Sequence, residues 1–173
     1  MKAIVFLTAT LLFIAGSLAR LVTGKLLPIA RERGQVSTQE VRAIFEAYWG
    51  SISAGKLDDL EQFFTEDAVF EDTTLGHVWR GRDEIVGILR KFFSAMPTRL
   101  EIEFFTGAGD GFGIGWVNTA VHVSDMLGFP PPTGKQFVVR GASIGKIRDG
   151  RIAFKADYWD RMAVLRQLTE NSQ

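Results

Sequence analysis

The spacing of apolar residues changes near Pro97, and that change restricts the fold class of this chain. Before Pro97, apolar residues recur at helical spacing, as in Val41, Ile44, Phe45 and Tyr48. After it, apolar and polar residues alternate, as in strands, over residues 99–106, 112–124, 136–148 and 151–160. Helices followed by long antiparallel strands predict an α+β fold, with one curved antiparallel sheet wrapped around the N-terminal helices. Such a sheet encloses an apolar pocket, which is the usual place for a ligand.

Local signals predict where the elements begin and end. Ser37-Thr38-Gln39-Glu40 is a capping box that begins the first helix, and Ala54-Gly55 ends it. A shorter second helix is expected at 57–64, then a strand at Ala68–Phe70 and a loop from Thr73 to Trp79. A third helix precedes the long strands, and a short amphipathic helix follows them.

The N-terminal residues predict a targeting segment ahead of one domain. Residues 1–19 match a secretory signal peptide: Lys2 supplies a positive charge, an apolar run follows, and Ser17-Leu18-Ala19 fits a cleavage site. Cleavage would give a secreted or periplasmic protein without a membrane span, and the alternative is an uncleaved membrane anchor. We interpret residues 20–35 as a linker or pro-segment and residues 36–169 as the folded domain.

Composition excludes several classes of function. The chain has 20 basic and 20 acidic residues without a basic block, which argues against a nucleic-acid partner. It has no cysteine and only two isolated histidines, so neither thiol chemistry nor a metal site is expected. Residues 141–145 match G-x-S-x-G, but no histidine follows them, as a serine nucleophile would require. No cofactor is predicted. Fourteen Phe and four Trp favour a core or pocket built from flat rings.

A first resemblance is carried by residues 48–72. A helical Tyr48, the turn Ala54-Gly55-Lys56-Leu57 and the strand end Glu71-Asp72 resemble the ketosteroid isomerases of the nuclear transport factor 2-like superfamily. The resemblance implies a cone-shaped fold around an apolar pocket, with Asp72 as the proton-shuttling base and Tyr48 as a donor to an enolate oxygen. The isomerases add a protonated aspartate on a late strand, where this chain has Ser143 or Ala142.

A second resemblance is carried by residues 126–160. The proline-rich hairpin, the turn Arg148-Asp149-Gly150-Arg151-Ile152 and the exit Tyr158-Trp159-Asp160 resemble SnoaL-like polyketide cyclases. In that family a late-strand aspartate is the acid/base of an aldol ring closure. The resemblance makes Asp157 the candidate for this role.

Each candidate catalytic residue also has a structural interpretation. Asp72 ends an apolar strand, where burial would raise its pKa, but it could instead cap the following loop. Tyr48 lies on the buried stripe of its helix and could serve a ligand or Asp72, or be a plain core residue. Asp157 alternates with Lys155 and Trp159 on one strand face, and could simply pair at the surface with Lys155 or Arg161.

The predicted substrate-binding residues come from three segments. Trp116, Asn118 and His122 share one strand face, which is polar enough to line a pocket, although a satisfied core histidine is the alternative for His122. Ser143 offers a hydroxyl donor, and Trp79 lies on the loop that Asp72 faces.

These observations predict a cofactor-free acid/base isomerase or cyclase that acts on a hydrophobic, ring-bearing carbonyl compound. The alternative is a non-catalytic carrier of a small apolar ligand. In either case the open face of the sheet, with Val117, Val121 and Val123, could form a homodimer.

Overall fold

The computed structural model describes residues 37–126 and 128–170, so the predicted signal peptide and the linker or pro-segment lie outside the described residues. No helix within those ranges is both long enough and apolar enough to cross a membrane.

Helix α2 (Thr38–Ser53) confirms the predicted capping box. The Ser37 hydroxyl accepts a hydrogen bond from the Glu40 N–H at 3.1 Å, and a Glu40 carboxylate oxygen accepts one from the Ser37 N–H at 2.7 Å. The helix stops as expected at Gly55, whose φ of 70° is a left-handed conformation that glycine adopts freely. Its buried face carries Val41, Phe45, Tyr48, Trp49 and Ile52.

The predicted second helix is a 3₁₀ helix, η1 (Leu57–Phe63), rather than an α-helix. Its inward residues Leu57, Leu60 and Phe63 recur every third position, which is the period of a 3₁₀ helix. The side chain of Lys56 does not cap the start of η1, so no capping hydrogen bond stabilises a longer helix there.

The strands form a six-stranded sheet in the order β2-β1-β6-β5-β4-β3. Their bounds are β1 (Phe64–Asp72), β2 (His77–Arg80), β3 (Thr98–Ala108), β4 (Gly111–Val121), β5 (Gln136–Arg148) and β6 (Arg151–Trp159). The segment from Thr73 to Trp79, predicted as a loop, is therefore a tight turn followed by the start of β2, which pairs with β1.

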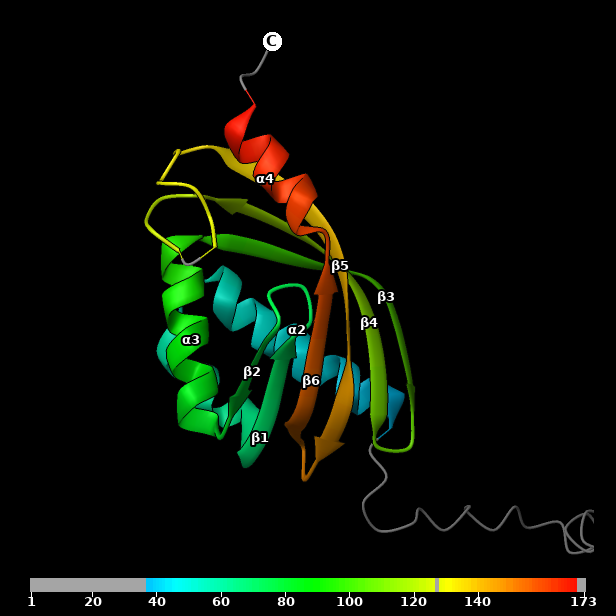
Figure 1. Cartoon of the computed structure of the whole chain (residues 1–173). Helices are drawn as coiled ribbons and strands as arrows, with labels where there is room; N and C mark the ends of the chain where they lie inside the picture. The colour runs from blue at the N-terminus through cyan, green and yellow to red at the C-terminus, as the bar shows by residue number, and fades with distance from the viewer. Residues whose placement is uncertain (1–36, 127, 171–173) are drawn as a thin grey trace, which may run out of the picture. The chain divides into compact units, whose positions relative to one another are not determined.

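One strand pair corrects the prediction of an antiparallel sheet. Strands β1 and β6 run parallel, whereas the other neighbours are antiparallel. The chain leaves β2 through α3 (Arg82–Ala95) and enters the sheet again at the far edge, β3, so that β6 comes back alongside β1 (Figure 1). This return pairs Phe70 with Lys155 and Asp72 with Asp157.

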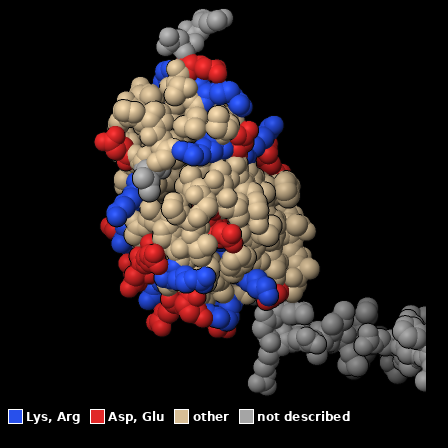
Figure 2. Space-filling model, viewed as in Figure 1, with Lys and Arg blue, Asp and Glu red and all other residues tan. Residues whose placement is uncertain are grey.

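The helices bury the inner side of the sheet. Helix α2 crosses the sheet, α3 lies beside β1 and β2, and α4 (Arg161–Thr169) follows β6 (Figure 1). On the face drawn in Figure 2, acidic and basic side chains are intermixed around a broad uncharged area. Of the three valines expected to face outward, Val123 is 49% exposed and Val117 and Val121 are half-buried, so the homodimer stays a prediction.

Candidate active site

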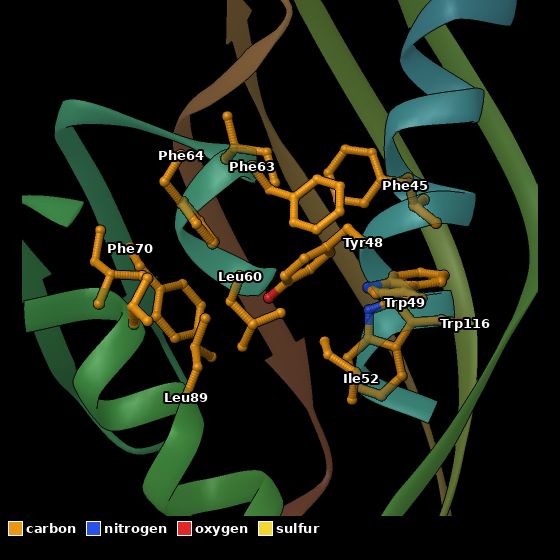
Figure 3. Packing of buried hydrophobic residues seen from close by; sticks show 14 of the residues in the cluster. Phe45, Tyr48, Trp49, Ile52, Leu60, Phe63, Phe64, Phe70, Leu89 and Trp116 are labelled. Carbon is orange, nitrogen blue, oxygen red and sulfur yellow. The ribbon is translucent and has the colours of Figure 1, made fainter. Parts of the chain in front are cut away.

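A cavity of about 410 Å³ lies between the sheet and the helices. Most of the side chains that line it are apolar or aromatic, including Trp49, Phe70, Leu89, Phe92 and Phe137. Figure 3 shows how rings from α2, η1 and β1 pack together next to it. Because such walls exclude water, the few polar groups that reach the cavity act in a medium of low polarity.

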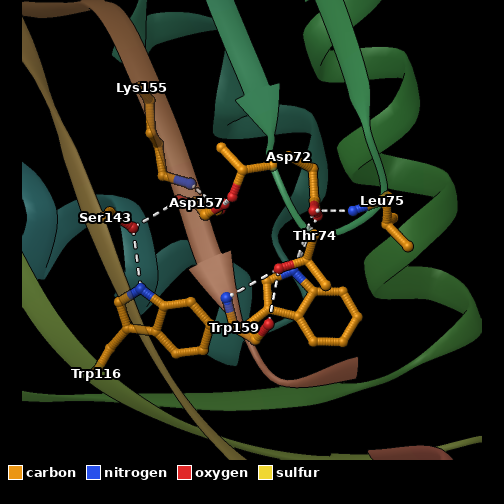
Figure 4. Close-up of polar contacts among 9 residues, drawn as sticks. Asp72, Thr74, Leu75, Trp116, Ser143, Lys155, Asp157 and Trp159 are labelled. Atoms are coloured by element: carbon orange, nitrogen blue, oxygen red, sulfur yellow. Dashed lines mark hydrogen bonds and ion pairs between the residues drawn. The ribbon is translucent and has the colours of Figure 1, made fainter. Parts of the chain in front are cut away.

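Asp72 lies in this cavity at the end of β1, and only 7% of it is exposed. Its carboxylate accepts hydrogen bonds from the Leu75 N–H at 2.8 Å and from the Trp159 indole N–H at 3.0 Å (Figure 4). Burial raises the pKa of this carboxyl and the charge of Asp157 adds to the rise, while the two donors oppose it. The raised pKa makes Asp72 a stronger base than an exposed aspartate, as predicted, and the bond from Leu75 confirms the alternative as well, since Asp72 caps the following loop.

Asp157 lies beside Asp72, but its hydrogen-bond partners are different. It is bonded to the ammonium of Lys155, and the Ser143 hydroxyl donates to it at 2.6 Å. Ser143 in turn accepts a hydrogen bond from the Trp116 indole N–H at 2.9 Å. The structural interpretation therefore named the right partner, Lys155, but the wrong location. The pair is not at the surface, since Lys155 is 4% exposed and both residues line the cavity.

Tyr48 projects from α2 into the same cavity. It is 1% exposed, and the rings of Phe63 and Phe64 pack against its edges and faces. In Figure 3 its hydroxyl points away from α2, toward the side where Leu60 lies. That hydroxyl forms no hydrogen bond with any described residue, Asp72 included. Burial first, and the charge of Asp157 second, hold the pKa of Tyr48 well above 10.0, so the group stays protonated and can donate.

The predicted substrate-binding residues divide into two groups. Trp116, Asn118, Ser143 and Trp79 line the cavity, and Trp79 stacks on Phe70 at 5.3 Å from its position on β2. The Asn118 side chain forms no hydrogen bond within the described part of the chain.

His122 is placed differently from the others. It is 0% exposed and is not among the residues that line the cavity, although its ring lies 6.2 Å from that of Phe129, which does. Both ring nitrogens lack a hydrogen-bond partner among the described residues. His122 is therefore a buried group behind the cavity wall, and the satisfied core histidine is not what the structure shows.

Several polar side chains of this cavity were not predicted as site residues, among them Lys155, Trp159, Arg161 and His77. The signal for the first two was present, because the two-residue period of a strand places both on the same face as Asp157. Lys155 and Trp159 were not predicted because that strand face was taken to be exposed to solvent.

No group of three or more His, Asp or Glu side chains gathers as metal ligands would within residues 37–126 and 128–170. The polar groups of the cavity are two carboxylates, an ammonium, a guanidinium, the imidazole of His77, hydroxyls, an amide and indole N–H groups. These are suited to moving and holding protons.

A comparison of the sequence with protein families finds one match, the SnoaL-like polyketide cyclase, over residues 39–168. The chain belongs to the SnoaL-like polyketide cyclase family. The resemblance seen in residues 126–160 is thereby confirmed for the family. No protein with a curated description is similar to this chain in sequence.

Solved structures with this SnoaL-like fold confirm the architecture. TsrD from Streptomyces laurentii has a TM-score of 0.69 and 21% identity, covering 78% of this chain and 98% of its own. A SnoaL-like polyketide cyclase from Agrobacterium tumefaciens C58 has a TM-score of 0.63 and 19% identity, covering 77% and 99%. A Catenulispora acidiphila protein with a ketosteroid isomerase-like fold, in complex with trimethylamine, has a TM-score of 0.60 and 23% identity, covering 78% and 96%. At these identities the likeness concerns the fold.

Proposed function

We propose that this SnoaL-like protein is a cofactor-free acid/base catalyst that moves a proton next to the carbonyl of a hydrophobic, ring-bearing compound, as an isomerase or cyclase does. One observation carries the proposal. A buried carboxyl with a raised pKa, Asp72, and a buried hydroxyl without a partner, Tyr48, line the same apolar cavity. A base and a free donor in one water-poor site are what enolate formation needs.

In the proposed reaction Asp72 takes a proton from the carbon next to the carbonyl, and an enolate forms. The Tyr48 hydroxyl donates a hydrogen bond to the enolate oxygen, where negative charge develops. Asp72 then returns the proton to a different carbon in an isomerisation. In a ring closure the enolate carbon attacks a second carbonyl, whose oxygen becomes an alkoxide and takes the proton back from Asp72. The cavity rings hold the substrate by burying its apolar surface.

We assign the proton transfer to Asp72 rather than to Asp157, which the cyclase resemblance favours. Asp157 already receives hydrogen bonds from Lys155 and Ser143, and charge-assisted bonds of this kind stabilise a carboxylate. Asp72 receives hydrogen bonds from two neutral donors only, and the charge of Lys155 lowers its pKa without reversing the rise caused by burial. Its proton is therefore the one whose position a substrate can change.

The test follows the conversion of a β,γ-unsaturated ketosteroid to the conjugated enone by ultraviolet absorbance, with the full chain. We expect turnover by the wild type and a loss of about 10²–10⁴-fold in Asp72→Asn, because the base is removed while its shape is kept. Asp83→Asn is the matched control, since that side chain is 98% exposed, and it should leave turnover unchanged.

Two outcomes would count against the proposal. Equal turnover in wild type and Asp72→Asn would show that another group is the base. If neither protein turns over ketosteroid but both bind it with the same affinity, measured by quenching of tryptophan fluorescence, the carrier alternative would be favoured. Secretion, a separate prediction, is tested by whether the mature chain begins at residue 20.

A further inference from the structure

Arg161 is a charged residue of the cavity to which the proposed chemistry gives no role. It is the first residue of α4, it is half-buried, and it lines the cavity. One guanidinium nitrogen, Nη2, donates a hydrogen bond to the Gly128 carbonyl. The Nε atom is buried and has no hydrogen-bond partner among the described residues.

No described acidic residue pairs with Arg161. None of the ion pairs formed within residues 37–126 and 128–170 includes it. The adjacent carboxylate, Asp160, caps α4 by accepting the Ala163 N–H at 2.9 Å. A half-buried guanidinium without a counter-charge is costly, because it has lost part of its hydration without gaining an anion.

The other charges of the cavity leave Arg161 unbalanced. Lys155 and Asp157 neutralise each other. The charges that shift the pKa of Asp72 are those of Asp157 and Lys155, and Arg161 is not among them. Arg161 is thus a separate positive charge on the cavity wall.

Two parallel aromatic rings lie beside the loop that Arg161 contacts. The rings of Phe129 and Trp159 are stacked with an interplanar angle of 6° and a centroid distance of 6.2 Å, and both line the cavity. Gly128, next to Phe129, has a φ of 85°, and a Cβ there would lie 3.2 Å from Arg161 Nη2. The absence of a side chain lets the loop backbone pack directly against the guanidinium.

We propose that Arg161 binds an acidic group of the ligand, so that the substrate of the proposed reaction is a ring-bearing carbonyl compound that also carries a carboxylate. This inference rests on the proposed function for the cavity and narrows its substrate class. A guanidinium keeps its charge at all physiological pH values, and its fork of N–H groups matches a carboxylate. Apart from the bond from Nη2 to Gly128, the guanidinium N–H groups have no hydrogen-bond partner among the described residues, and Nε among them is buried.

The test compares two probes that differ only in charge, anthraquinone-2-carboxylate and anthraquinone-2-carboxamide. Dissociation constants for the full chain are measured by quenching of tryptophan fluorescence. We expect the wild type to bind the carboxylate about 10–100-fold more tightly than the carboxamide. In Arg161→Gln that preference should fall to about one-fold, while the carboxamide affinity is kept.

Two further variants sharpen the result. Arg161→Lys keeps the charge without the fork and should retain part of the preference for the carboxylate. Arg166→Gln is the matched control, because this exposed arginine lies on the same helix, and it should leave both affinities unchanged.

Three other outcomes are possible, and each of them would reject the inference about Arg161. If Arg161→Gln weakens both probes equally, Arg161 only fastens the loop at Gly128 and the inference is wrong. If the wild type binds both probes equally, the inference is wrong and the proposed function stands, and this result needs no variant to fold. If the wild type binds neither probe, the inference is rejected, and the ketosteroid assay alone decides on the proposed function.

Discussion

The end of β1 and the neighbouring position on β6 each present an aspartate to the same cavity, yet the two carboxyls have different hydrogen-bond partners. Asp72 on β1 receives neutral N–H donors, from Leu75 and Trp159. Asp157 on β6 receives a cation, Lys155, and a hydroxyl, Ser143. The parallel pairing of the two strands brings these contrasting environments to adjacent positions.

The difference teaches that the neighbours of a carboxyl, more than its identity, determine its chemistry. A group fixed by a cation and a short chain of donors holds its charge in place. A group that is buried without a cation binds its proton more tightly and can exchange it with a substrate. The cavity therefore holds one carboxyl that is paired with a cation beside one whose pKa is raised.

The largest expected effect comes from removing the cation of the β6 site. Lys155→Met should lower the free energy of unfolding by about 3–5 kcal/mol, because it leaves the charge of Asp157 buried and unpaired. Urea denaturation at neutral pH measures this loss, and adding Asp157→Asn should recover most of it. Lys146→Met is the matched control: Lys146 is 64% exposed, 3.7 Å from Asp110, and its pair is worth about 0–1 kcal/mol. Equal losses of unfolding free energy in Lys155→Met and Lys146→Met would show that the buried pair is worth no more than the surface pair.

A smaller effect is expected from the hydroxyl of the β6 site. Ser143→Ala should cost about 1–3 kcal/mol, since it leaves Trp116 without an acceptor and Asp157 without a donor. The same denaturation experiment checks it, with the exposed Ser124→Ala as control. No loss in Ser143→Ala would mean that Lys155 alone holds Asp157.

The smallest effect concerns the β1 site and depends on pH. Since the folded protein raises the pKa of Asp72, it binds this proton more tightly than the unfolded chain does. Stability from this group is therefore full below the ordinary aspartate pKa and declines as pH rises through the raised value. Asp72→Asn should lack this decline. At pH values above the raised pKa, its free energy of unfolding should exceed that of the wild type.

Urea denaturation of the wild type and of Asp72→Asn across the acidic pH range gives the difference between their free energies of unfolding. That difference isolates the contribution of Asp72. The hydrogen bond from Arg148 lowers the pKa of the exposed Asp67, an effect of opposite sign that cancels because both proteins contain it. A difference that grows in favour of wild type with rising pH would contradict the raised pKa.

Part of the site could be predicted from the sequence and part could not. Asp72, Tyr48 and Asp157 were identified from local context and resemblance, and all three line the cavity. His122 was expected beside Trp116 and Asn118 because the three share a strand face. It is buried in phase with them, one residue beyond the end of β4, but lies near Phe129 and does not line the cavity. Lys155 was mistaken for a surface residue because a charged side chain is rarely buried unless paired.

The sequence by itself determined the order of elements, the ends of α2 and of the hairpins, and the family, because capping, glycine turns and apolar periodicity act over a few residues. Only the tertiary structure decided that β6 returns parallel to β1, and so that Asp72 lies beside Asp157. Trp159, which donates to the Asp72 carboxylate, is 87 positions away in the sequence, and Thr73, which donates to the backbone carbonyl of Asp157, is 84 positions away. Contacts of that kind leave no periodic trace in a sequence, since they depend on how the whole chain packs.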